Sequence, residues 1–102
     1  VKKQLKQFTD NDNVEDFSVE GLSMSVEKHL LRYFELHGSS QPPPGLYNRI
    51  IKEVEYPLIA LSLSSSKGNQ LKASKLLGIN RNTLRKKIAE LDINVSQTKK
   101  MM

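Results

Sequence analysis

The sequence contains no cysteine. This absence excludes a disulfide framework, a thiol nucleophile and any zinc or iron–sulfur site with cysteine ligands. No uninterrupted apolar run approaches the roughly 18 residues of a transmembrane helix. Residues 1–7 lack the apolar core of a signal peptide, and the chain begins at Val1 rather than at a methionine. We therefore expect a fragment of a longer protein, and no transmembrane helix within these 102 residues.

Recognisable catalytic and cofactor motifs are also missing. His29 and His37 lie eight residues apart without carboxylates at metal-ligand spacing, so surface or interface positions are expected for both. The serine-rich stretch 62–66 has no obvious histidine base, and the chain has no Gly-x-x-x-x-Gly-Lys phosphate loop. The sequence predicts a protein that is not an enzyme and that needs no metal or cofactor.

Positive charge is concentrated in the second half of the chain. Residues 1–45 carry a net charge of −2, whereas residues 46–102 carry +7. Between Lys67 and Lys87 there are seven cations and no acid. Such a density of charge attracts a polyanion, because each phosphate contact releases condensed counterions. A solvated basic face and a basic amphipathic helix on a membrane surface are the alternatives at this point.

Hydrophobic spacing predicts an all-α fold. Ser23 or Ser25 can cap the start of the first helix, and Gly38 ends it, because glycine takes the left-handed conformation at little cost. Asn69 and Asn80 are the expected caps of two later helices. The expected helices run from about 23 to 37, from 46 to 65, from 70 to 77 and from 81 to 91.

The two ends of the chain lack this periodicity. The polar stretch 9–13 and the residues around it show no helical face. We interpret residues 1–22 as a largely disordered linker and residues 96–102 as a flexible tail. These boundaries leave one folded domain at residues 23–95.

The helix at 46–65 is apolar on two sides. A helix of this kind packs against more than one neighbour, and in so short a chain the extra neighbour is expected to be a second subunit. Pro57 lies inside the helix and removes one hydrogen-bond donor, which predicts a kink rather than two separate helices.

Residues 70–91 form a helix-turn-helix pattern. Ala73 is small where the two helices cross, and Gly78 allows the positive φ of the turn. Leu84 and Ile88 anchor the second helix and leave its other face open. The residues expected to point inward are Ala73, Leu76, Leu77, Ile79, Leu84, Ile88 and Leu91.

The open face of the second helix is suited to DNA. It carries Arg81, Asn82, Arg85 and Lys86. The major groove of B-DNA admits one helix, and the O6 and N7 atoms of guanine suit a bidentate arginine. Asn69, Thr83 and Lys87 are expected to contact phosphates. A plain helical hairpin with a solvated basic face is the competing interpretation.

Three motifs resemble the Fis family of DNA-binding domains: LYNRIIKEVEYPL at 46–58, KGNQ at 67–70 and LGINRNTLRKKI at 77–88. The upstream runs SVEKHLLRYF at 25–34 and PPPGLY at 42–47 are more particularly similar to the C-terminal domains of NtrC-type nitrogen regulators of alphaproteobacteria. The resemblance covers about residues 22–95.

This resemblance implies a bacterial, cytoplasmic and nucleoid-associated homodimer. The first two helices of each subunit would form an intertwined four-helix core, followed by the helix-turn-helix. The implied core residues are Leu30, Phe34, Tyr47, Ile50, Ile51, Val54, Leu58 and Leu61. The implied base contacts are Asn80, Arg81 and Lys86. The implied phosphate contacts are Asn69, Thr83, Arg85, Lys67 and Lys72. One departure is Leu71, where the family has a small polar residue that touches phosphate, so that contact is expected to be absent.

The resemblance also implies how a whole protein would work. NtrC-type activators carry a phosphoacceptor receiver domain and an ATPase domain that acts on RNA polymerase with the enhancer-dependent sigma factor. Neither domain lies in these residues, which would bind enhancer DNA as a dimer. A stand-alone Fis-like protein that bends DNA is the alternative, and a dimerisation module for a protein partner is another.

Overall fold

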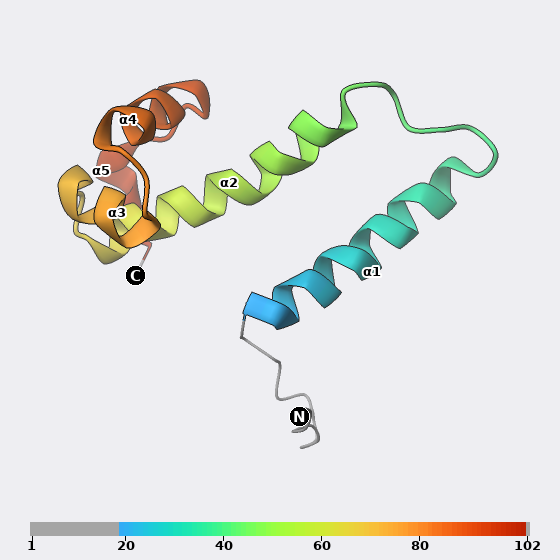
Figure 1. Ribbon diagram of the computed structural model, residues 1–102, viewed down its shortest axis with the longest axis horizontal. Coiled ribbons are helices and arrows are strands. Elements are labelled where there is room, and N and C mark those ends of the chain that lie inside the picture. The colour runs from blue at the N-terminus through green and yellow to red at the C-terminus, as the bar shows by residue number, and fades with distance from the viewer. Residues whose placement is uncertain (1–18, 102) are drawn as a thin grey trace, which may run out of the picture. The chain divides into compact units, whose positions relative to one another are not determined.

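The chain is all-α over the part that the structure describes, and the predicted fold class is confirmed. The computed structural model describes residues 19–101, which hold five helices and no strand (Figure 1). The chain divides into two units, residues 1–43 and 44–102, which are described separately below. The first unit contains α1, and the second contains α2 to α5.

Helix α1 spans Val19–His37 and begins earlier than expected. Ser23 and Ser25 lie inside the helix instead of capping it. The single Gly21 costs only about 1 kcal/mol in a helix interior, so nothing after residue 18 prevents the helix from forming. Residues 1–18 of the expected linker lie outside the described part. As predicted, the helix ends before Gly38, whose φ is 59°.

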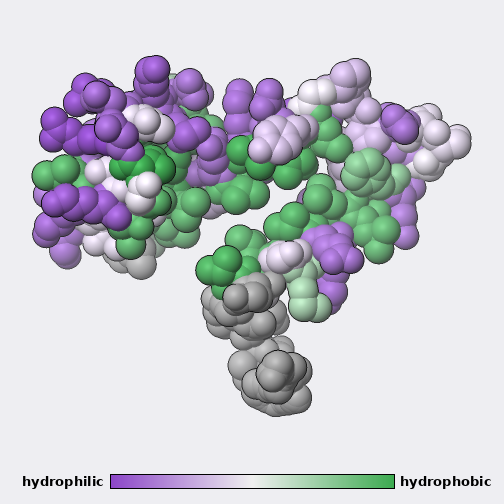
Figure 2. Space-filling model, in the orientation of Figure 1, coloured by the Kyte–Doolittle hydropathy of each residue, from purple (hydrophilic) through white to green (hydrophobic). Residues whose placement is uncertain are grey.

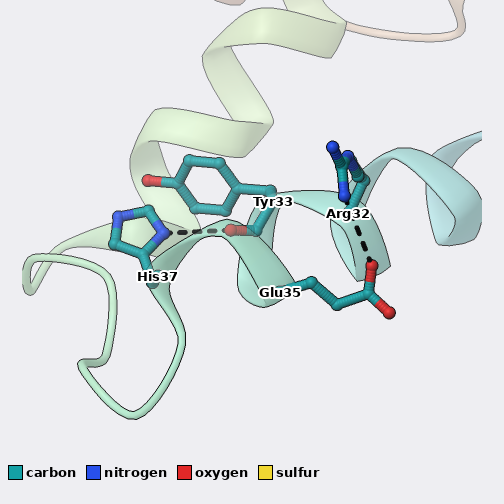
Figure 3. Close-up of polar contacts among 4 residues, drawn as sticks. All are labelled: Arg32, Tyr33, Glu35 and His37. Carbon is teal, nitrogen blue, oxygen red and sulfur yellow. Dashed lines mark hydrogen bonds and ion pairs between the residues drawn. The ribbon is translucent and has the colours of Figure 1, made fainter.

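The last turns of α1 are held by local contacts (Figure 3). The Nδ1 atom of His37 donates to the carbonyl oxygen of Tyr33 at 2.9 Å, and their rings meet edge to face with centroids 4.7 Å apart. Arg32 and Glu35 form an exposed ion pair at 4.0 Å. The side chain of His37 therefore makes its hydrogen bond within its own helix.

Helix α2 spans Leu46–Ser65 as one continuous helix through Pro57, as predicted. It ends in a Schellman motif, in which Lys67 takes the left-handed conformation with φ of 54°. The N–H of Gly68 donates to the carbonyl oxygen of Leu63 at 2.8 Å, and the N–H of Lys67 donates to that of Ser64 at 3.0 Å. The chain turns sharply here into the next helix. The expected kink at Pro57 stays a prediction.

Three short helices complete the second unit. They are α3 (Gln70–Leu77), α4 (Arg81–Glu90) and α5 (Val95–Thr98). The predicted caps are confirmed for α3 and α4, because the side chain of Asn69 accepts from the N–H of Lys72 at 3.1 Å and that of Asn80 accepts from the N–H of Asn82 at 2.7 Å.

The existence of α5 corrects the expectation of a flexible tail at 96–102. Asn94 caps this helix by accepting from the N–H of Gln97 at 3.2 Å, and Thr98 is buried. The helix packs against α2. A four-residue helix has too few apolar positions to show a period, so only its packing partner reveals it.

One small core holds the second unit together. It contains Ile59, Leu63, Ala73, Leu84 and Ile93, of which Leu63 and Leu84 are completely buried. Leu77, Ile79, Ile88, Leu91 and Val95 pack around this cluster. Each of the helices α2, α3 and α4 therefore contributes to the same core.

The predicted inward position of Leu76 is wrong. Its side chain is 62% exposed. Helix α3 instead turns Ala73, Ser74 and Leu77 inward, and Leu76 lies on the flank of that face. Ser74 is buried because its hydroxyl donates to the carbonyl oxygen of Leu71 at 2.8 Å, which removes the usual cost of burying a polar group.

The two apolar sides of α2 have different surroundings. Ile59 and Leu63 lie on the side that enters the core. The opposite side carries the six residues of α2 that were expected in a dimer core, Tyr47, Ile50, Ile51, Val54, Leu58 and Leu61. Of these, Tyr47 is 76% exposed and Leu58 is 53% exposed, while Leu61 is also exposed.

Asp92 allows a test of backbone strain in this fold. It has φ of 55° in the turn after α4, a conformation that costs a residue with a Cβ about 1–2 kcal/mol. Glycine avoids that cost but loses more entropy on folding. We expect Asp92→Gly to be about 0.5–1 kcal/mol more stable to urea unfolding than Asp92→Ala. Both variants lose the carboxylate, so equal stabilities would argue against strain at this position.

Candidate nucleic-acid interface

The helix-turn-helix is formed by α3, a three-residue turn and α4. Gly78 opens the turn with φ of 76°, and its N–H donates to the carbonyl oxygen of Ser74 at 2.8 Å. Ile79 is half-buried against the core, as expected. These contacts fix where α4 begins, and α4 then packs against α3.

The outer face of α4 presents polar and cationic side chains to solvent. Arg81, Asn82, Arg85 and Lys86 are all exposed, whereas Leu84 on the opposite side is completely buried. Figure 2 shows hydrophilic side chains gathered over α4 and hydrophobic ones along α2. A helix anchored on one side and cationic on the other can enter a groove between two phosphate backbones without giving up its core contacts.

Asn80 combines a structural role with a place at the edge of this surface. Its side-chain oxygen holds the N–H of Asn82, which satisfies one of the unpaired donors at the start of α4. The cap uses only the oxygen, so the amide nitrogen can still donate to a base. Asn80 and Arg81 therefore stand together at the N-terminal end of α4, where a recognition helix contacts base edges.

The expected phosphate contacts lie at the starts of the two helices. Asn69, Lys67 and Lys72 surround the beginning of α3, and Thr83 lies in the first turn of α4. All four side chains are exposed. Leu71, the departure from the family pattern, is 46% exposed between them and offers no hydrogen bond.

Lys87, another expected phosphate contact, is paired with an acid of the same chain. Its ammonium forms an ion pair with Glu55 of α2, with 2.7 Å between Nζ and Oε2. The two side chains are 32% and 25% exposed respectively. Lys87 follows Thr83 by one turn, on the flank of α4 that faces α2 rather than on the outer face. In the chain without DNA the ammonium of Lys87 is thus held by Glu55, and its expected phosphate contact stays a prediction.

The ion pair also shifts the pKa of Lys87. The hydrogen bond to Glu55 raises the pKa of Lys87 above its ordinary value of 10.5, against a smaller opposite effect of burial. A lysine with a raised pKa stabilises the folded state only while it is protonated. The contribution of the pair is therefore complete at neutral pH and is lost as the pH rises above 10.5.

Two features of this region could not be read from the sequence. Glu55 lies outside the acid-free stretch, so its approach to Lys87 shows only in the packing of α2 with α4. The side chain of Lys99 crosses Gly68, since a Cβ placed on Gly68 would lie 2.5 Å from its Cε. Helix α5 thus brings another cation beside Lys67 and the start of α3.

The two histidines belong to α1, in the first unit. His29 is exposed, and His37 bonds within its own helix. Across residues 19–101 no group of three or more histidine and acidic side chains is placed to hold a metal ion. In the same part of the chain, no helix combines the length and the apolar character needed to cross a bilayer.

The sequence of this region is similar to those of known bacterial regulatory proteins. Residues 50–91 match the family model described as "Bacterial regulatory protein, Fis family". A DNA-binding transcriptional regulator NtrC of Azospirillum brasilense is 60% identical over 82 residues, which are 80% of this chain. The chain spans only 17% of the length of that regulator.

Shorter relatives are covered more completely. A DNA-binding protein Fis of Proteus mirabilis is 41% identical over 71 residues, which are 69% of this chain and 70% of that protein. A putative Fis-like DNA-binding protein of Neisseria meningitidis serogroup A is 41% identical over 70 residues, which are 68% of this chain and 86% of that protein. No solved structure matches the chain significantly.

The cap of α4 gives a stability test. Asn80→Ala removes the acceptor for the N–H of Asn82 and should lower the free energy of unfolding by about 1 kcal/mol. Asn80→Asp keeps an acceptor oxygen and should stay within about 0.5 kcal/mol of the wild type. Urea unfolding measures both. Asn82→Ala is the matched control, because its own side chain caps nothing, and a loss equal to that of Asn80→Ala would refute the capping role.

Proposed function

The chain belongs to the Fis family of bacterial regulatory proteins, and from that premise we propose that it binds specific DNA sites as the C-terminal domain of an NtrC-type activator. The single observation that carries specific binding is the exposed cationic face of α4, on which Arg81 and Lys86 face solvent while Leu84 is completely buried. The NtrC assignment is supported by the higher identity to the Azospirillum brasilense regulator than to the Fis proteins.

We assign separate roles to the polar residues of the helix-turn-helix. Asn80, Arg81 and Lys86 read base edges in the major groove, where bidentate contacts distinguish the base pairs. The residues assigned to phosphates are Lys67, Asn69, Lys72, Thr83 and Arg85. Phosphate contacts fix the register of the domain on the duplex but carry no sequence information themselves.

A homodimer is part of this proposal. The outward side of α2 exposes Tyr47, Leu58 and Leu61, and α1 exposes Phe34 and Leu31. Exposed apolar rows of this length are unusual on a monomer and favour burial against another chain. A second copy of α1 and α2 would cover them and place two recognition helices on one duplex. Leu30, Ile50, Ile51 and Val54 are the remaining residues that we assign to this dimer core.

The whole protein would then combine this domain with others. In an NtrC-type activator of nitrogen assimilation, a two-component receiver domain and an ATPase domain would precede residue 23. The present domain would be the predicted unit of residues 23–95, extended by the first turn of α1 and by α5. It would tether the ATPase domain at enhancer sites in the bacterial cytoplasm, close to RNA polymerase with its sigma factor.

A stand-alone, Fis-like architectural protein is the second candidate. It is favoured by the extent to which the chain covers Fis-like relatives, up to 86% of their length. Such a protein would bend DNA with little preference for sequence. The two functions differ in the ratio of affinities for a selected site and for random DNA.

Arg81 is the residue on which specific reading depends most. Arg81→Ala should weaken binding to a duplex selected by the wild-type chain by about 1–3 kcal/mol and should weaken binding to random DNA much less. Lys72→Ala, which removes a phosphate contact, should weaken both alike and lower the salt slope by about 1 per subunit. Titrations at one fixed salt concentration measure this. An equal loss on both duplexes for Arg81→Ala would support the architectural alternative.

The proposed dimer can be tested by replacing each of two exposed leucines with a charged residue. Leu58→Glu places a carboxylate in the exposed row of α2, and Leu76→Glu places one on the flank of α3; these side chains are 53% and 62% exposed. The wild-type chain should sediment at about twice 11.6 kDa. Leu58→Glu should sediment as a monomer, because the dimer would bury that charge unpaired, whereas Leu76→Glu should remain a dimer. Dimers for both variants would exclude this face of α2 as the interface.

A further inference from the structure

The ion pair between Glu55 and Lys87 connects the long helix α2 directly to the recognition helix α4. Nζ and Oε2 are 2.7 Å apart, a short, charge-assisted hydrogen bond. Both side chains are about two-thirds buried or more. Glu90, one turn further along α4, adds a weaker attraction to the same ammonium. The ion pair on α1, between Arg32 and Glu35, is by contrast exposed and longer, at 4.0 Å.

The remaining contacts of α4 are apolar. Leu84, Ile88 and Leu91 pack into the shared core, and α4 rests on α3. Apolar burial is not directional, so it resists separation of the helices more strongly than small rotations or shifts of one along the other. A hydrogen-bonded ion pair has a defined length and direction, and it lies on the flank of α4, away from the centre of the core.

This difference matters for reading DNA. A binding group must be held within about 0.5 Å and 10–20° of its productive geometry. Arg81 and Lys87 are six residues apart on the same rigid helix, so rotation of α4 moves both together. A contact that fixes Lys87 against α2 therefore also limits the directions in which Arg81 and Lys86 can point.

The pair also has an electrostatic effect. An ammonium that is paired with a carboxylate adds little net positive charge to the surface. Binding to DNA regardless of sequence depends on that net charge, because each phosphate contact releases counterions. Lys87 lies next to Lys86 in a stretch without acids, where a free ammonium would add to random binding. Glu55 supplies from α2 the negative charge that this stretch lacks.

We propose that Glu55 is a positioning residue for sequence-specific DNA binding. Its carboxylate holds Lys87, and through Lys87 the recognition helix, in the orientation that reads bases, and it keeps the ammonium of Lys87 from strengthening random binding. This inference rests on the proposed function of the chain as a specific DNA-binding domain.

Glu55→Gln tests the proposal, because the amide keeps the size of the side chain but removes the negative charge that holds the ammonium of Lys87. The probes are a duplex selected from a random pool by the wild-type chain and a duplex of unrelated sequence. For the variant we expect about tenfold weaker binding to the selected duplex, equivalent to the loss of about one base contact. Binding to the unrelated duplex should become tighter, with a salt slope steeper by about 1 per subunit. A purely structural pair would not change that slope.

Glu53→Gln is the matched control. Glu53 is an exposed acid on the same helix, so this variant removes the same charge without releasing Lys87. It should leave the ratio of the two affinities unchanged. The reversed pair, Glu55→Lys with Lys87→Glu, should recover most of the ratio that Glu55→Gln loses, since an ion pair can form again between the two positions.

A second variant covers the case in which Glu55→Gln does not fold. Glu55→Gln with Lys87→Gln leaves no unpaired charge at the site; it should also lower the ratio of affinities but without tighter binding to the unrelated duplex. Circular dichroism establishes whether each variant is folded. If the folded variants keep the wild-type ratio, or lose affinity for both duplexes equally, the positioning role is wrong. If the wild-type chain itself shows no preference, the proposed function fails, and the inference fails with it.

Discussion

Burial of Leu63 and Leu84 in one shared cluster is the interaction on which the rest of the second unit depends. Leu63 comes from α2 and Leu84 from the recognition helix, and neither is exposed at all. Ala73 of α3 belongs to the same cluster and is completely buried, and in a close-packed core its small size lets α3 approach closely. This small core decides which side of α4 faces inward, and so it decides which side remains open to DNA.

The charged side chains around that core fall into two groups, those exposed to solvent and those paired within the chain. Exposed cations on α4 and around the start of α3 provide attraction to phosphates, which depends on salt and not on sequence. The pair of Lys87 with Glu55 is different, since it uses a cation of the recognition helix for internal contact. In our proposal, the exposed lysine of α4 attracts DNA, whereas the lysine that is paired with Glu55 helps to orient the helix on it.

The long helix α2 serves two surfaces at once. Near its C-terminal end, Ile59 and Leu63 belong to the core and α5 packs alongside. On its other side the apolar row that includes Tyr47 and Leu58 is exposed in the single chain. The presence of α5 means that part of the double-sided apolar character is explained within one chain, and the exposed row is what remains for the second copy that we propose.

The sequence by itself determined the all-α fold, the continuous helix through Pro57, the caps Asn69 and Asn80 and the exposed face of α4. These features follow from local preferences and from the 3.6-residue period, which act within a few residues. Only the tertiary structure decided that α5 forms, that Leu76 faces solvent and that Lys87 pairs with Glu55. Those outcomes depend on residues that are distant in sequence and adjacent only after packing, where neither period nor capping pattern carries information.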